Sequence, residues 1–220
     1  MSHKLVIYVG EKNISSWSMR GWLALALKGV PFDERLISLR EDRDRSRRRK
    51  VSPTGRVPVL HHAERVIPDS LAIIEYLEEI FPPPKHPALW PSDTGERADA
   101  RWLSATMHSG FTKLREAMSF NLCFLPRRPF PPKEALTEAA EMLLLWEECL
   151  SRKKGDGRYL FGPFGAVDIM YAPAVVRLTA FGVPTSSTAR AAAYMQDVLA
   201  HPLVKRWMDA ARSLSPIETE

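Results

Sequence analysis

The chain has 220 residues and a formal net charge of +5, with 45% hydrophobic and 26% charged residues. This length suits one large domain or two small ones, and the composition is ordinary for a globular protein. No apolar run approaches the roughly 18 residues that span a bilayer, and the N-terminus lacks a signal-peptide core, so we expect no membrane partner and a cytoplasmic location. Cys123 and Cys149 lie far apart and form no CxxC motif, which favours a reducing compartment.

The first part of the chain mixes short strand-like runs with helix-like segments. Gly29 and Pro31 close the first helical segment, because glycine favours a helix C-cap and proline cannot continue the helix. The predicted order begins with a strand at 4–9, a helix at 19–28, a strand at 32–39 and a basic helix at 43–50. Two strands and a helix follow within residues 52–77.

The stretch 52–77 carries two features that point to a binding site. Pro58 heads an apolar strand and has no N–H group, so it belongs at a strand start or edge and can follow a cis peptide bond. Asp69 and Ser70 precede an apolar run at helical spacing, so they lie at a helix start with free N–H groups. A strand edge beside a helix N-terminus can hold a small peptide with a carboxylate.

The second part of the chain is expected to be all-helical. A proline-rich connector at 81–91 marks a boundary, and no strand pattern follows it. We therefore predict two domains, 1–82 and 92–220. The predicted helices, with a proline-rich break at 125–132, cover residues 94–120, 133–151, 166–181, 189–200 and 203–213. The scattered histidines and cysteines show no ligand spacing, so we expect no metal.

The sequence Ser-Pro-Thr-Gly-Arg-Val-Pro-Val-Leu at 52–60, followed by Asp-Ser-Leu-Ala-Ile-Ile-Glu-Tyr-Leu at 69–77, resembles the glutathione-binding half of the cytosolic glutathione S-transferase family. The resemblance extends over nearly the whole chain, and it is closest to serine-type, zeta- or tau-like members of bacterial style. It implies an α/β thioredoxin-like domain followed by an all-α domain. It also implies glutathione as co-substrate, a role in detoxification, and a homodimer.

The resemblance assigns four residues to glutathione. The residue before the cis-proline pairs backbone-to-backbone with the cysteine of glutathione in this family, which implies that role for Val57. Asp69 and Ser70 would hold the γ-glutamyl end, and as plain helix caps they would still offer the same N–H groups. Arg56 matches a position where relatives carry a polar or basic residue that reaches the tripeptide. An ordinary surface arginine is the alternative for Arg56.

The Ser15-Ser16-Trp17-Ser18 loop precedes the first helix, where a hydroxyl can donate a hydrogen bond to a thiolate. A free thiol has a pKa near 8.5, and lowering it by about two units takes roughly 2.7 kcal/mol. A charge-assisted hydrogen bond and a helix end together supply that order of energy. The resemblance places the catalytic serine at Ser15. Ser16 and Ser18 stay open as alternatives, and so does a role as simple helix caps.

Three residues on about one face of the helix that follows the connector are candidates for the electrophile site, because this face looks toward the sulfur in the family. His108 is a proton relay or an ordinary helix histidine. Phe111 lines the pocket or belongs to the core. Arg115 binds an anionic substrate or forms an ion pair with a carboxylate of the protein.

We therefore predict an enzyme that activates the thiol of glutathione and transfers it to an electrophilic small molecule. One alternative is an isomerase of the maleylacetoacetate isomerase type, although Trp17 stands where that class has a cysteine. A second is a non-catalytic binding module with the same fold. The basic run from Arg43 to Lys50 has no interleaved aromatic residues, so we interpret it as a solvated helix face and expect no nucleic-acid partner.

One position departs from the family pattern. Relatives carry Ser or Thr as a capping-box partner three residues before the aspartate that matches Asp168, whereas this chain has Gly165. Glycine is a tolerable helix cap, weaker by a few tenths of a kcal/mol. We expect this departure to affect a detail of folding and not the function.

Overall fold

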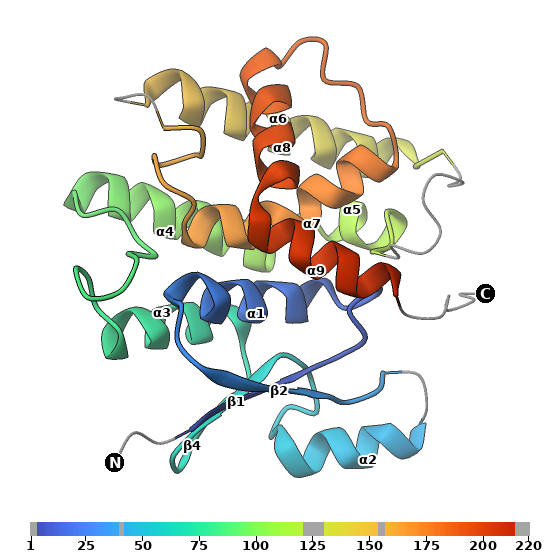
Figure 1. Cartoon of the computed structure of the whole chain (residues 1–220). Coiled ribbons are helices and arrows are strands. Elements are labelled where there is room, and N and C mark those ends of the chain that lie inside the picture. Colours follow the sequence, from blue (N-terminus) through green and yellow to red (C-terminus); the bar gives the residue numbers. More distant parts are fainter. Residues whose placement is uncertain (1–3, 40–41, 121–129, 154–156, 214–220) are drawn as a thin grey trace.

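The structure is a computed structural model that describes residues 4–39, 42–120, 130–153 and 157–213. Cys123 and most of the predicted break at 125–132 lie outside these ranges. A four-stranded sheet with flanking helices occupies one side of the molecule, and a layer of helices occupies the other (Figure 1). The predicted fold class, an α/β part followed by an all-helical part, is confirmed.

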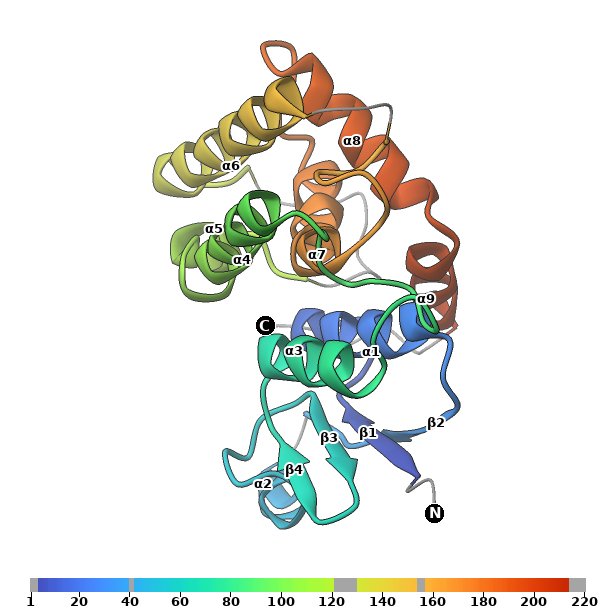
Figure 2. The same cartoon turned by 90° about the vertical axis from the view of Figure 1, so that its left-hand side faces the viewer.

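The sheet has the strand order β2-β1-β3-β4, in which β1 pairs in parallel with β2 and antiparallel with β3. Helices α1 and α3 cover the face of the sheet that looks toward the helical layer, and α2 covers the opposite face (Figures 1 and 2). These elements are β1 (Leu5–Val9), α1 (Ser16–Lys28), β2 (Phe32–Leu36), α2 (Asp42–Val51), β3 (Val59–His62), β4 (Arg65–Ile67) and α3 (Ser70–Ile80).

The second layer contains α4 to α9, with α7 at its centre and buried from Ala166 to Leu178 (Figure 2). None of the helices in the described ranges is long and apolar enough to cross a membrane. The domain limits 1–82 and 92–220 stay a prediction. The helices are α4 (Thr94–Ser109), α5 (Thr112–Ala117), α6 (Lys133–Arg152), α7 (Ala166–Ala180), α8 (Ala189–Ala200) and α9 (Pro202–Arg212).

The single helix predicted over 94–120 is wrong, because the chain turns at Gly110. A Cβ atom on Gly110 would lie 2.7 Å from the carbonyl oxygen of Thr106, so the turn closes tightly on the end of α4. Phe111 follows in the left-handed region, with φ of 54°, which ends one helix and starts α5 in a new direction. Sequence periodicity alone does not reveal this break.

Two predicted element boundaries also shift. α1 begins at Ser16 and not near Met19, because Ser15 acts as its N-cap and accepts a hydrogen bond from the N–H of Ser18. The strand predicted over 32–39 ends at Leu36, where the registered pairing with β1 also ends.

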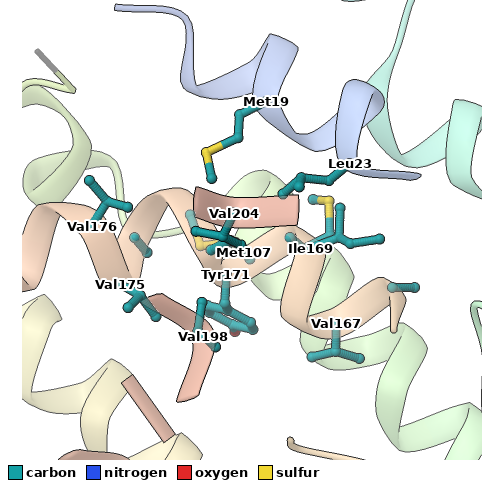
Figure 3. Close-up of a cluster of buried hydrophobic side chains, with 14 of the residues drawn as sticks. Met19, Leu23, Met107, Val167, Ile169, Tyr171, Val175, Val176, Val198 and Val204 are labelled. Atoms are coloured by element: carbon teal, nitrogen blue, oxygen red, sulfur yellow. The ribbon is translucent and has the colours of Figure 1, made fainter. Parts of the chain in front are cut away.

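Helix α1 is shared by the two layers. It packs against β1 and α3 on one side and against α7 and α9 on the other. Met19 and Leu23 project from α1 toward the helical layer, where Leu23 lies near the buried side chain of Ile169 on α7 (Figure 3). The hydrophobic core therefore continues from the sheet into the helical layer, and α1 is held from both sides.

A buried lysine fixes the connector between the layers. The Nζ atom of Lys28, at the end of α1, lies 2.8 Å from the carbonyl oxygen of Phe81 and 2.9 Å from that of Pro87. The carboxylate of Glu78 forms an ion pair with the same ammonium and accepts a hydrogen bond from the N–H of Leu89. All three donors of this buried ammonium are thereby used.

The start of α7 explains the unusual glycine. The N–H of Ala166 donates to the carbonyl oxygen of Leu89 over 2.8 Å, and a Cβ on Gly165 would lie 2.8 Å from that same oxygen. Serine or threonine does not fit here without moving the connector. Asp168 accepts hydrogen bonds from the N–H of Gly165 at 2.9 Å and from that of Leu160 at 3.2 Å, so one half of the predicted capping box is kept.

The Asp168 carboxyl predicts a pH effect on stability. Burial raises its pKa to about 6, against hydrogen bonds from Gly165 and Leu160 that lower it. The unfolded chain ionises this group near pH 4, so the wild type loses relative stability as the pH rises from about 4 to about 6. Urea titrations give the free energy of unfolding of the wild type and of Asp168→Asn at each pH. We expect the wild-type value minus the variant value to fall by about 3 kcal/mol between about pH 4 and about pH 6. A constant or rising difference would contradict this.

Candidate active site

A cavity of about 310 Å³ lies where the segment that leads into β3, the start of α3 and the helices α4 and α5 meet. The structure brings most of the predicted site residues together around it, namely Arg56, Val57, Asp69, Ser70, His108 and Arg115. A larger cavity of about 710 Å³ beside the connector and the start of α7 contains none of these residues. The smaller cavity is therefore the candidate site.

Val57 and Pro58, the two residues before β3, lie beside this cavity and are joined by a cis peptide bond. The pairing between β1 and β3 ends at Val59, so the backbone groups of Val57 lie beyond the ladder and face the cavity region. A Cβ on Gly21 would lie 3.0 Å from Cγ of Pro58, which shows that α1 packs directly against the proline. α1 and the segment that leads into β3 therefore fix each other's position.

The start of α3 forms a second wall. Asp69 caps this helix, because its Oδ1 atom accepts hydrogen bonds of 2.9 Å from the N–H groups of Leu71 and Ala72. Ser70 is only 2% exposed, and among the described residues its hydroxyl has no hydrogen-bonding partner. An orphaned hydroxyl beside the first N–H groups of a helix matches a ligand carboxylate.

His108 links the two layers at this point. Its Nε2 atom lies 2.8 Å from Oδ2 of Asp69, and its ring packs against Trp17 with ring centroids 5.3 Å apart. Both oxygens of Asp69 are thus engaged, one by the helix and one by His108. A cationic group of a ligand that approaches Asp69 must share Oδ2 with His108 or displace it.

The three serines of the first loop are all buried. The hydroxyl of Ser15 donates to Oγ of Ser18 over 2.7 Å, and Ser18 also accepts the N–H of Gly10 at 2.9 Å. Oγ of Ser16 accepts a hydrogen bond of 3.1 Å from Arg177. Of this loop only Trp17 lines the cavity, with Ser15 two residues away at the N-cap of α1.

A group of arginines lies at the cavity wall and behind it, with Arg115 among the lining residues. The guanidinium of Arg20 lies over the ring of Trp17, with Cζ 4.2 Å from the ring centroid, and Cζ of Arg115 lies 5.4 Å from the same centroid. Burial lowers the pKa of Arg20 well below its usual range, and the nearby charges of Arg177 and Arg115 lower it further. Burying such a charge costs several kcal/mol unless it is compensated.

Sequence reasoning missed Trp17, Arg20 and Arg177. Trp17 had a signal, since it departs from the family pattern, but no periodicity brings Arg177 next to the first loop. Phe111 is 8% exposed, packs into the hydrophobic core and does not line the cavity. Its left-handed backbone positions α5 and thereby Arg115. In the described part of the chain, no group of three potential metal ligands comes together.

A model of the glutathione S-transferase N-terminal domain matches residues 14–80, and a model of the C-terminal domain matches residues 105–210. The chain belongs to the glutathione S-transferase family. It is therefore a member of a family of transferases, and both domain models fall on the two layers described above.

Individual relatives agree with this assignment. A probable maleylacetoacetate isomerase from Caenorhabditis elegans is 30% identical over 84% of this chain and 84% of its own length. Glutathione S-transferase 1 from Dianthus caryophyllus is 29% identical over 95% of this chain and 87% of its own length. A glutathione transferase homologue from Burkholderia GL BGR1, solved with bound glutathione, is 28% identical and superposes with a TM-score of 0.71 over 96% of this chain and 99% of that one.

The cap at Asp69 gives a stability prediction. Asp69→Ala removes two hydrogen bonds to the start of α3 and the contact with His108, and we expect it to lower the free energy of unfolding by about 1 kcal/mol in urea titrations. Asp69→Asn keeps an oxygen for the helix N–H groups and should cost less than half of that. Asp93→Ala, which removes the equivalent cap of α4, is the matched control. Equal losses in the two Asp69 variants would refute the capping role.

Proposed function

We propose that this protein binds glutathione in the 310 Å³ cavity, holds its sulfur as a thiolate with Ser15 and transfers it to an electrophilic small molecule. The observation that carries the proposal is the convergence of cis-Pro58 and the start of α3, with its unpartnered Ser70 hydroxyl, on one cavity. The solved relative with bound glutathione supports it.

Each part of glutathione has a group of suitable chemistry on the cavity walls. The backbone of Val57 pairs with that of the cysteine, because its groups lie outside the sheet ladder. Ser70 and the start of α3 receive the γ-glutamyl carboxylate, and Asp69 receives the ammonium group beside it. Arg56 is exposed at the cavity rim, where it can reach a carboxylate of the tripeptide.

The sulfur is activated through a pair of hydroxyls. In the structure the Ser15 hydroxyl donates to Ser18. On binding, Ser15 rotates its hydrogen toward the sulfur, and the fully buried Ser18 hydroxyl donates to Ser15 in return. The start of α1 adds its partial positive charge. Together these groups stabilise the thiolate, and the thiol proton passes to solvent.

The reaction needs no covalent intermediate with the enzyme. In a substitution, a carbon–sulfur bond forms and the leaving group departs with the electron pair of the bond that breaks. In an addition to a conjugated carbonyl compound, the double-bond electrons move to the carbonyl oxygen and the enolate then takes a proton from water. The protein contributes positioning and nucleophile activation.

A second candidate function is glutathione-dependent isomerisation, favoured by the 30% identity to a probable maleylacetoacetate isomerase. Here the same thiolate adds to a double bond, the resulting single bond rotates, and glutathione leaves again unchanged. Product analysis with maleylacetoacetate and glutathione distinguishes the two functions. An isomer without a stable conjugate supports isomerisation.

We also propose that the protein is a cytoplasmic homodimer that acts in detoxification. Cysteine usage and the family resemblance support the location and the role. Val66 on β4 and Trp102 on α4 are large apolar side chains that are 43% and 48% exposed, and a partner chain that covers them would remove them from water. A sedimentation mass of one chain would rule out the dimer.

Ser15→Ala tests the catalytic role. Without the hydroxyl, we expect the pKa of the bound thiol to return toward 8.5, so kcat/KM falls roughly tenfold to fiftyfold near pH 6.5. The loss should nearly vanish near pH 9, where the thiol ionises unaided. Steady-state kinetics with 1-chloro-2,4-dinitrobenzene across this pH range provide the measurement.

Three further serine variants complete the experiment. Ser18→Ala should give a smaller loss of kcat/KM with the same pH dependence, because it removes only the hydroxyl that is hydrogen-bonded to Ser15. Ser151→Ala, on the exposed end of α6, is the matched control and should match the wild type. If Ser16→Ala shows the pH-dependent loss and Ser15→Ala does not, the assignment to Ser15 is wrong.

A further inference from the structure

Positive charge gathers at one part of the cavity, where Trp17 and Arg115 line it and two further arginines lie behind them. The Cζ atoms of Arg20 and Arg115 lie 4.2 Å and 5.4 Å from the ring centroid of Trp17. Arg177 stands next to them and binds the hydroxyl of Ser16. We call Trp17, Arg20, Arg115 and Arg177 the arginine wall.

This charge is poorly compensated. Arg20 is fully buried, and its Nε atom donates to the carbonyl oxygen of Met170, while Nη1 and Nη2 have no partner among the described residues. Asp69 is the carboxylate whose charge favours the cationic form of Arg20, but Asp69 is already paired with His108. A buried cation with two unused donor nitrogens strengthens the binding of any nearby anion.

Arg115 is the arginine of the wall that lines the cavity and can touch a ligand. It is half-buried and lines the cavity, and its Nε atom donates to the carbonyl oxygen of Phe111 over 3.3 Å. No hydrogen bond of its Nη atoms to another described residue is present. A guanidinium with two free Nη atoms beside a cavity suits a planar anion such as a carboxylate.

We propose that the arginine wall binds an anionic group, a carboxylate or a sulfonate, on the electrophile, with Arg115 in contact and Arg20 and Arg177 supporting it from behind Trp17. This inference rests on the proposed function and names the substrate class of that same site.

A carboxylate at this wall could come from the electrophile or from glutathione itself. The γ-glutamyl carboxylate is matched by Ser70 and the start of α3, which form the second wall. The glycyl carboxylate is the remaining source within glutathione. The experiment therefore compares ligands that share the tripeptide and differ only in the group attached to sulfur.

The measurement is calorimetric binding of S-(4-carboxybutyl)glutathione and S-pentylglutathione, which have the same chain length on sulfur with and without a carboxylate. We expect the wild type to bind the carboxylated conjugate roughly tenfold more tightly or better, as for a charge-assisted hydrogen bond. Arg115→Gln should remove most of this preference and leave the affinity for S-pentylglutathione and free glutathione within about twofold.

Two further variants distinguish the loss of the Arg115 charge from a change in the structure of α5. Arg115→Lys keeps the charge and should keep part of the preference. Lys113→Gln removes an exposed charge from the same helix and should change nothing, which controls for net charge and for the integrity of α5. Thermal unfolding of each variant shows whether it is folded.

Three results would overturn the inference. Equal binding of both conjugates by the wild type would show that the wall does not recognise an anion on the electrophile, while leaving the proposed function intact. An equal loss for glutathione and both conjugates in Arg115→Gln would assign Arg115 to the glycyl carboxylate. No binding of glutathione or either conjugate by the wild type would overturn the proposed function as well.

Discussion

The packing of α1 between the sheet and the helical layer is the constraint on which the site depends. One side of α1 contacts Pro58 closely at Gly21, and the other places Met19 and Leu23 against the helical layer. Its N-terminal end is consequently fixed both relative to the segment that leads into β3 and relative to the second layer. Ser15, Trp17 and Arg20 all belong to this end, so the serine that we propose activates the thiol and part of the arginine wall are positioned by one buried helix.

Polar contacts across the layers define the geometry where apolar packing cannot. Arg20 donates to Met170, Arg177 donates to Ser16, and His108 meets Asp69. Each of these joins the first part of the chain to the second beside the cavity. Hydrophobic contacts tolerate small shifts, whereas buried polar groups are costly when their partners move. The cavity should therefore keep its shape, although the uncompensated charge of Arg20 reduces the stability of the fold.

The sequence predicted the succession of strands and helices in the first part of the chain, the helix that begins at Ser70 and Pro58 as a place for a cis peptide bond, because proline chemistry, capping residues and apolar periodicity are local signals. It also placed Val57, Asp69, His108 and Arg115 near one site through the family resemblance. It did not predict the break at Gly110 and Phe111, where a backbone turn overrides helical periodicity. Nor did it reveal the arginine wall, since the proximity of Arg20 and Arg177 exists only after the layers have packed.

The ionisation of glutathione bound to the wild-type protein tests the role of the start of α1 most directly. Glutathione labelled with ¹³C at the cysteine β-carbon reports its thiol pKa by NMR when titrated in the presence of saturating protein. We expect a pKa about two units below the value of about 8.5 for a free thiol. A bound thiol that titrates like free glutathione would contradict the proposal that the start of α1 stabilises a thiolate.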